Sequence, residues 1–92
     1  MAEGDGSAGG DAVVLRFWAA ARAAAGCEQE RCSAGSVQAV LAAAVERHPA
    51  LAELLPRCSY LLDGVAVASA ELHTRPVRPG NTLEVLPPFA GG

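Results

Sequence analysis

The chain has 92 residues, about half of them apolar, and a formal net charge of −3. This length allows one small domain with a dense aliphatic core, and four aromatic residues are too few to line a large cofactor cavity. Residues 12–92 carry seven arginines against seven acids, so the sequence shows no basic footprint of a nucleic-acid-binding protein.

The first eleven residues are rich in glycine and acids and have no apolar period. We predict a disordered lead-in over residues 1–11, because such a segment cannot bury enough apolar surface to fold. It has neither the basic start nor the apolar run of a signal peptide. Elsewhere no segment approaches the roughly 20 apolar residues of a membrane span. We therefore expect a cytoplasmic protein without membrane contact.

A strand is predicted first, over Ala12–Trp18, where residues on alternate positions share a face. The predicted core face holds Val13, Leu15 and Phe17. An alanine-rich run, Ala19–Ala25, is long enough for two helical turns and ends at Gly26, a residue typical of helix C-caps. The polar segment Cys27–Ser33 has the length of an edge strand.

The main helix is predicted to start at Ser36, a good N-cap, and to end at His48–Pro49. Its apolar residues recur with the helical period and form one stripe. The stripe consists of Val37, Val40, Leu41, Ala44 and Val45. A further helical turn is expected from the spacing of Leu51, Leu54 and Leu55.

Two more strands are predicted around Asp63–Gly64, which is the strongest hairpin signal in the chain. They are Arg57–Leu62 and Val65–Ala68. After a turn at Arg78–Asn81, Thr82–Leu86 is predicted as the last strand, with Leu83 and Val85 on one face.

This order of elements predicts an α+β domain over residues 12–86, with a mixed sheet and one main helix packed on one face. The β-grasp, or ubiquitin-like, arrangement fits best, because it lets the first and last strands lie side by side. Residues 87–92 are then an extended tail.

Neither the cysteines nor the histidines form a recognisable reactive motif. An odd number of cysteines without an export signal favours three reduced thiols, at Cys27, Cys32 and Cys58, with at least one of them packed as a small hydrophobe. We predict no metal site, because the two histidines are far apart and there is no C-x-x-C motif. His48 and His73 are interpreted as solvated or capping residues, and no internal catalytic site is predicted.

The end of the sequence carries the strongest functional signal. After the last strand come Pro87, Pro88, Phe89, Ala90, Gly91 and Gly92. With the turn and strand over Arg78–Leu86, the start Leu15–Gly26 and the helix Ser36–Pro49, this ending resembles the MoaD/ThiS family of ubiquitin-like sulfur carriers. Within that family it is most similar to the small subunit of molybdopterin synthase.

Two departures from the family pattern are visible. Asn81 stands where the family normally has an acid after the turn glycine, and extra residues occur around Ala66–Glu71. Neither change touches the tail.

The resemblance implies that the C-terminal carboxylate of Gly92 is adenylated and then thiocarboxylated. ATP belongs to an E1-like (MoeB-like) adenylyltransferase, and a sulfurtransferase supplies the sulfur, so the chain itself needs no bound cofactor. The tail then enters the large catalytic subunit (MoaE-like) and donates sulfur to cyclic pyranopterin monophosphate. The chain is thus expected to be a non-catalytic sulfur-carrier subunit.

The residue types of the tail suit this role. Glycines at 91 and 92 lack a Cβ, so they give a thin profile that threads a narrow channel and an unhindered acyl carbon. Pro87 and Pro88 stiffen the exit from the sheet. Trp18 and Leu86 fall on the non-core faces of the first and last strands, where we expect an exposed apolar patch for the large subunit.

Three alternatives remain open at this stage. The same chemistry could serve thiamine, cysteine or tRNA thiolation. The chain could instead be a ubiquitin-like modifier that forms isopeptide bonds with other proteins. It could also be a plain binding domain with an incidental Gly-Gly ending.

Overall fold

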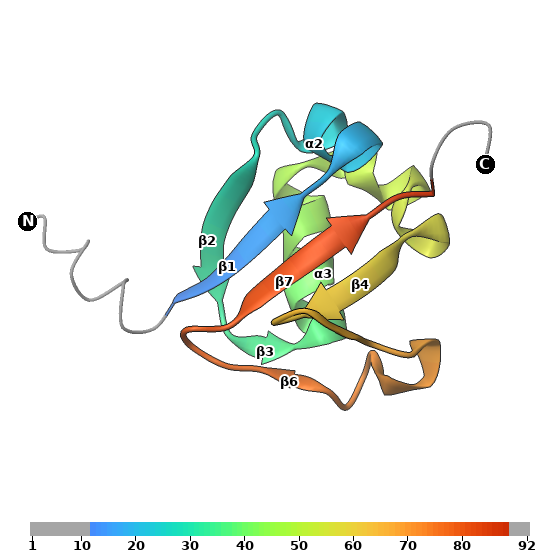
Figure 1. Ribbon diagram of the computed structural model, residues 1–92. Coiled ribbons are helices and arrows are strands. Elements are labelled where there is room, and N and C mark those ends of the chain that lie inside the picture. The colour runs from blue at the N-terminus through green and yellow to red at the C-terminus, as the bar shows by residue number, and fades with distance from the viewer. Residues whose placement is uncertain (1–11, 89–92) are drawn as a thin grey trace, which may run out of the picture.

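The computed structural model describes residues 12–88. The predictions for the lead-in, residues 1–11, and for Phe89–Gly92 therefore lie outside the described residues. Five strands form one sheet in the order β2-β1-β7-β4-β5 (Figure 1). Their bounds are Ala12–Phe17 (β1), Gln29–Ser33 (β2), Ser59–Leu62 (β4), Val65–Ala66 (β5) and Thr82–Leu86 (β7).

The first and last strands lie side by side at the centre of the sheet, as the sequence predicts. β1 and β7 run parallel, with Leu15 opposite Leu83 and Phe17 opposite Val85. The neighbouring strands β2 and β4 run antiparallel to them. Leu15, Phe17, Leu83 and Val85 are all fully buried, so β1 and β7 both place their predicted faces in the core.

Two helices join the sheet, and the larger one crosses behind it (Figure 1). Helix α3 (Val37–Arg47) begins at the predicted N-cap, where the Ser36 hydroxyl accepts a hydrogen bond from the Ala39 amide at 3.0 Å. The short helix α2 (Ala19–Ala25) ends at Gly26, whose positive φ of 77° suits glycine. The helical stripe packs on the core face of the sheet, which gives the β-grasp arrangement.

The core is one largely aliphatic cluster with two aromatic residues. Most of its members come from α2, α3 and the central strands, and Leu51, Val67 and Val77 come from outside these elements. Its buried residues are Val13, Leu15, Phe17, Ala21, Ala25, Val37, Val40, Leu41, Ala44, Leu51, Tyr60, Val67, Val77, Leu83 and Val85.

Several boundaries differ from the sequence prediction. The first strand stops at Phe17, because Trp18 takes the N-cap position of α2. Instead of one helical turn after His48, the chain makes two short 3₁₀ helices, Pro49–Glu53 (η1) and Leu55–Arg57 (η2). Pro49, the first residue of η1, and Pro56, the second residue of η2, lack the amide hydrogen that a continuing α-helix would need.

The predicted hairpin is present but shorter than expected. Asp63 and Gly64 have φ values of 48° and 85°, as a two-residue turn of the I′ type requires. Strand β5 ends at Ala66, because Val67 turns inward and is buried. The following residues include a third 3₁₀ helix, Ser69–Glu71 (η3).

A second, two-stranded sheet was not predicted. It pairs Gly35–Ser36 (β3) with Pro76–Val77 (β6), ahead of α3. Val77 is buried and closes that end of the core. Within residues 12–88, no helix is both long enough and apolar enough to cross a bilayer.

Candidate functional site

Strand β7 carries the chain out of the middle of the sheet toward the tail. It is bonded on one side to β1 and on the other to β4, where Ser59 lies opposite Leu86. The Trp18 amide also donates a hydrogen bond to the Val85 carbonyl at 3.1 Å. The base of the tail is thus held on both sides up to Leu86.

The start of β7 is anchored by one carboxylate. Asp63 accepts hydrogen bonds from the Thr82 amide at 2.8 Å and from the Asn81 side-chain amide at 2.6 Å. Asn81 also accepts a hydrogen bond from the Arg78 amide at 2.7 Å. The residue that departs from the family's usual acid therefore closes this turn through its own side chain.

The structure follows the predicted tail for two residues. Pro87 is buried and Pro88 is exposed, so the chain reaches the surface between them. The predicted threading residues Phe89, Ala90 and Gly91, and the carboxylate of Gly92, lie outside the described residues. The described part of the chain ends at Pro88, two residues after the paired strand β7.

The predicted docking patch is less apolar than the sequence suggested. Trp18 and Leu86 are both half-buried rather than exposed. The Trp18 indole Nε1 donates a hydrogen bond to Glu84 at 2.9 Å. The Arg16 and Arg22 guanidinium carbons lie 4.8 and 5.9 Å from the centre of the same ring. The expectation of an exposed apolar patch is therefore corrected to a mixed surface, because polar neighbours cover much of the indole.

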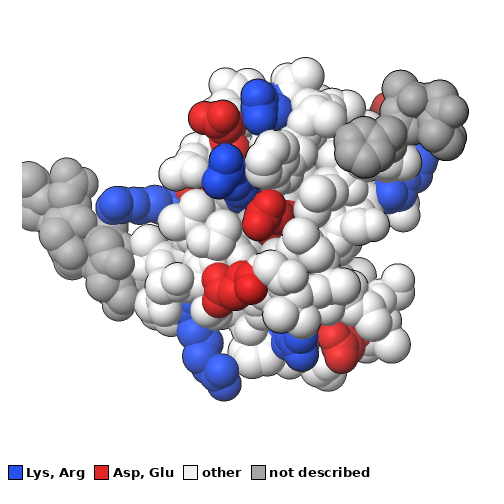
Figure 2. Space-filling view, viewed as in Figure 1, with Lys and Arg blue, Asp and Glu red and all other residues white. Residues whose placement is uncertain are grey.

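We call this surface, formed by Arg16, Trp18, Leu61, Glu84 and Leu86, the outer sheet face. Arg16, Glu84 and Leu61 lie opposite one another on neighbouring strands. Figure 2 views this side of the molecule and shows charges of both signs scattered among uncharged side chains. Sequence reasoning missed the part played by Arg16, Leu61 and Glu84, because their contacts depend on strand register.

One residue at this surface has an unusual backbone conformation. Ala19, directly after Trp18, has a φ of 49°, a region that residues with a Cβ seldom adopt. Such conformations cost about 1–2 kcal/mol, and they persist only where surrounding structure imposes them. Here the turn lets Trp18 lie on the outer sheet face while α2 packs on the core.

The three cysteines are unpaired, as predicted, and each of them is half-buried. All three pack against the core. Burial raises the pKa of each thiol, and at Cys27 the Glu30 carboxylate raises it further. A raised thiol pKa lowers the thiolate fraction and with it the nucleophilicity.

The two histidines differ. His73 is exposed, as predicted, whereas His48 is partly buried. His48 takes the C-cap position of α3, which agrees with a capping role. Its imidazole is not simply solvated, however, because Nε2 lies 2.9 Å from Glu30 Oε1. This contact joins residues 18 positions apart, and the sequence pattern gave no sign of it.

A groove of about 420 Å³ lies between α3, η2 and β4. Its walls are largely apolar and include Leu41, Val45 and Leu72. The Tyr60 hydroxyl in this wall donates a hydrogen bond to the Leu55 carbonyl at 2.7 Å, and burial raises its pKa to about 12. None of the side chains lining this groove carries a charge that would bind an ionic cofactor.

A mixed sheet with one helix across its face, and a central strand that leads into the tail, defines a small ubiquitin-like protein of the β-grasp class. The ThiS family model matches residues 15–92, and the chain belongs to the ThiS family. The small ubiquitin-like carriers of this type are generally non-catalytic. No protein with a curated description matches the chain.

Solved structures agree on the fold. Small archaeal modifier protein 1 from Methanosarcina acetivorans superposes with a TM-score of 0.77 at 23% identity, over 89% of this chain and 97% of that one. A Pyrococcus furiosus protein described as molybdopterin converting factor subunit 1 gives 0.73 at 18% identity, over 86% and 99%. A complex of subunits 1 and 2 of molybdopterin-converting factor from Helicobacter pylori gives 0.64 at 25% identity, over 88% and 99%.

Proposed function

We propose that this protein is a sulfur carrier that works through the carboxylate of Gly92, as the small subunit of molybdopterin synthase. The observation that carries the proposal is the family match over residues 15–92, which includes the whole Gly-Gly tail. The position of β7 supports it, because a strand held on both sides presents the tail from a rigid base.

The chemistry proceeds in two activation steps. A carboxylate oxygen attacks the α-phosphorus of ATP on an E1-like enzyme, and pyrophosphate leaves. The terminal sulfur of a cysteine persulfide on a sulfurtransferase then attacks the acyl carbon, and AMP leaves. A thiol cleaves the resulting acyl disulfide and forms a disulfide with the sulfurtransferase cysteine, so that a thiocarboxylate remains on Gly92. The carrier needs no cofactor of its own for either step. A supply of ATP and unoxidised thiols is found in the cytoplasm, where we place the protein.

Sulfur delivery requires a second protein. The tail enters the large catalytic subunit, where its sulfur attacks cyclic pyranopterin monophosphate and forms a thioester link. Water hydrolyses this thioester, which leaves the sulfur on the pterin and returns the carboxylate of Gly92. A dithiolene contains two sulfurs, so two charged carriers are consumed for each product. The outer sheet face lies beside the tail's base and is the surface we assign to contact with the large subunit.

Molybdopterin is preferred as the product because the Leu-Pro-Pro-Phe-Ala-Gly-Gly ending resembles that subunit. The fold neighbours from Pyrococcus furiosus and Helicobacter pylori are described as molybdopterin converting factors, which supports the same choice. The similarity to small archaeal modifier proteins favours one alternative, a protein modifier. Isopeptide adducts on lysines of other proteins would distinguish it.

The test is intact-mass analysis after incubation with the E1-like enzyme, ATP and a sulfur source. The mass should rise by the difference between sulfur and oxygen, and fragmentation should place the change at Gly92. Sulfur found as a persulfide on Cys27, Cys32 or Cys58 would contradict the mechanism. So would a mature protein, isolated from its own cells, whose chain continues beyond Gly92.

Tail variants test the threading step. Deleting Gly92 shortens the reach by one residue, about 3.5 Å, and should abolish sulfur delivery. Gly91→Ala adds a Cβ in the proposed channel and should slow adenylation or delivery, whereas Ala90→Gly, which removes one, should not. Charged carrier mixed with the large subunit and cyclic pyranopterin monophosphate should yield molybdopterin. Full activity of the Gly92 deletion would remove the proposal.

A further inference from the structure

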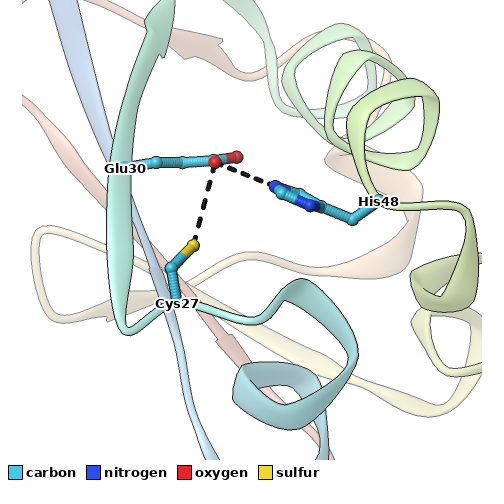
Figure 3. Close-up of side chains that lie close together, drawn as sticks. All are labelled: Cys27, Glu30 and His48. Carbon is cyan, nitrogen blue, oxygen red and sulfur yellow. Dashed lines mark hydrogen bonds and ion pairs between the residues drawn. The ribbon is translucent and has the colours of Figure 1, made fainter.

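Three side chains of metal-binding type meet at one point on the rim of the core (Figure 3). They are Cys27, Glu30 and His48, and one ligand atom of each lies within 4.8 Å of the other two. Among the described residues this group combines a thiol, a carboxylate and an imidazole. All three side chains are half-buried, so the site is partly shielded but open to ions.

Two of the three separations, those that involve Glu30, are close to the separations in a zinc site. Cys27 Sγ lies 3.9 Å and His48 Nε2 lies 2.9 Å from the same atom, Glu30 Oε1. Tetrahedral bonds of usual zinc lengths would place these pairs about 3.6 Å and about 3.4 Å apart. Movements of a few tenths of an ångström would therefore reach both distances, and half-buried side chains allow such movements.

The two oxygens of Glu30 have different partners. Oε1 faces the thiol and the imidazole, while Oε2 accepts hydrogen bonds from Arg47 Nε at 3.1 Å and from a terminal nitrogen of Arg47 at 2.6 Å. Carboxylates that bind metals are commonly held by such an outer hydrogen bond, which orients the free oxygen. Arg47 thus holds the carboxylate with Oε1 directed at the other two groups.

The Glu30 carboxylate and a Cys27 thiolate together carry two negative charges. These charges match a divalent cation.

The fold itself brings the three ligands together. Gly26 ends α2 in a left-handed conformation and turns the chain at Cys27. Glu30 lies on edge strand β2, and His48 ends α3, where its ring meets the edge of Phe17 at a centroid distance of 6.0 Å. The three ligands therefore come from the turn after α2, from β2 and from the C-cap of α3.

We propose that Cys27, Glu30 and His48 form a site for a zinc-class divalent cation. Sulfur, nitrogen and oxygen together suit zinc, and three protein ligands leave a fourth position for water or a small ligand. Binding forms bonds from the metal to Cys27 Sγ, Glu30 Oε1 and His48 Nε2. The thiol proton, and the Nε2 proton where the ring is protonated, pass to solvent. The cation links the turn after α2, edge strand β2 and the end of α3. This proposal does not depend on the proposed use of Gly92.

The test is titration of the untagged, fully reduced chain with Co²⁺ as a spectroscopic probe, followed by displacement with Zn²⁺. One equivalent of Co²⁺ should give a thiolate-to-cobalt charge-transfer band and the visible bands of tetrahedral cobalt. Cys27→Ser should abolish the charge-transfer band. His48→Gln and Glu30→Gln should weaken binding at least about tenfold. Zn²⁺ should raise the melting temperature of the wild-type chain and not that of Cys27→Ser.

Two matched controls use groups elsewhere in the chain. Cys58→Ser and His73→Gln remove a thiol and an imidazole outside the site, and both variants should bind as the wild type does. Circular dichroism without metal establishes that each variant is folded before its titration is read. Absence of a charge-transfer band in wild type would overturn the proposal. A band that survives Cys27→Ser, or one lost in Cys58→Ser, would overturn the assignment.

Discussion

Leu86→Glu tests whether the outer sheet face binds the large subunit. The side chain is half-buried in the free protein, so roughly half of a leucine's burial energy, about 1 kcal/mol, remains to be gained on docking. An unpaired carboxylate forced into the interface adds a penalty of about 1–3 kcal/mol. Glu84 already places one negative charge on this face, two residues away. The total is at least about 2 kcal/mol, which corresponds to about thirtyfold weaker binding.

The assay is calorimetric titration of the large subunit with each carrier variant, together with a thermal melt of the variant alone. Because Leu86 is not in the buried core, the fold should lose no more than about 1 kcal/mol. Val65→Glu is the matched control, since Val65 is 59% exposed on β5, the outermost strand of the same sheet. This control should bind normally.

Two results would refute this reasoning. Unchanged affinity for a folded Leu86→Glu variant would mean that the outer sheet face is not the interface. An equal loss in Val65→Glu would mean that the added charge weakens association without regard to position, since a general electrostatic effect is shared by both variants.

Three further predictions concern the fold and its thiols. Leu83→Ala should lower the free energy of unfolding by about 2–5 kcal/mol, because this fully buried side chain lies on β7 between β1 and β4. A loss under about 1 kcal/mol in chemical denaturation would contradict this reasoning. Ala19→Gly should be neutral or stabilising, because glycine adopts a positive φ without strain. Ala23→Gly in the same helix should cost about 1 kcal/mol of stability. Equal losses in thermal melts of the two variants would argue against strain at Ala19. Replacing all three cysteines with serine should leave sulfur transfer to Gly92 largely intact in the mass assay, even though metal binding is lost. If transfer is abolished in a variant that still folds, one of the thiols takes part in the mechanism.

Most of the regular elements could be predicted because their signals are local. The alternation in β1 and β7 and the stripe on α3 state which face of each element is apolar, and the buried residues match those faces. The turn at Asp63–Gly64 and the stop at Gly26 were recognisable because few residues adopt a positive φ. The short pair β3–β6 was missed, since two residues per strand leave no period to detect.

The contacts of the candidate sites could not be predicted in the same way. The hydrogen bond from Trp18 to Glu84 joins residues 66 positions apart, and it exists because β1 and β7 pair in a particular register. A shift of one residue in that register would place Glu84 on the core face. The sequence indicated which face Trp18 occupies, but not that an acid and two arginines surround it.

The sequence by itself indicated the class of the fold and the side-by-side placement of its first and last strands, and it predicts a tail after the last strand. Those features follow from periodicity, turn residues and the order of elements along the chain. The tertiary structure alone decided that Cys27, Glu30 and His48 converge, because the end of α3 must pack beside edge strand β2 before their side chains can meet. Such proximity depends on how the core sets helix against sheet, and the spacing of the residues along the chain contains no record of it.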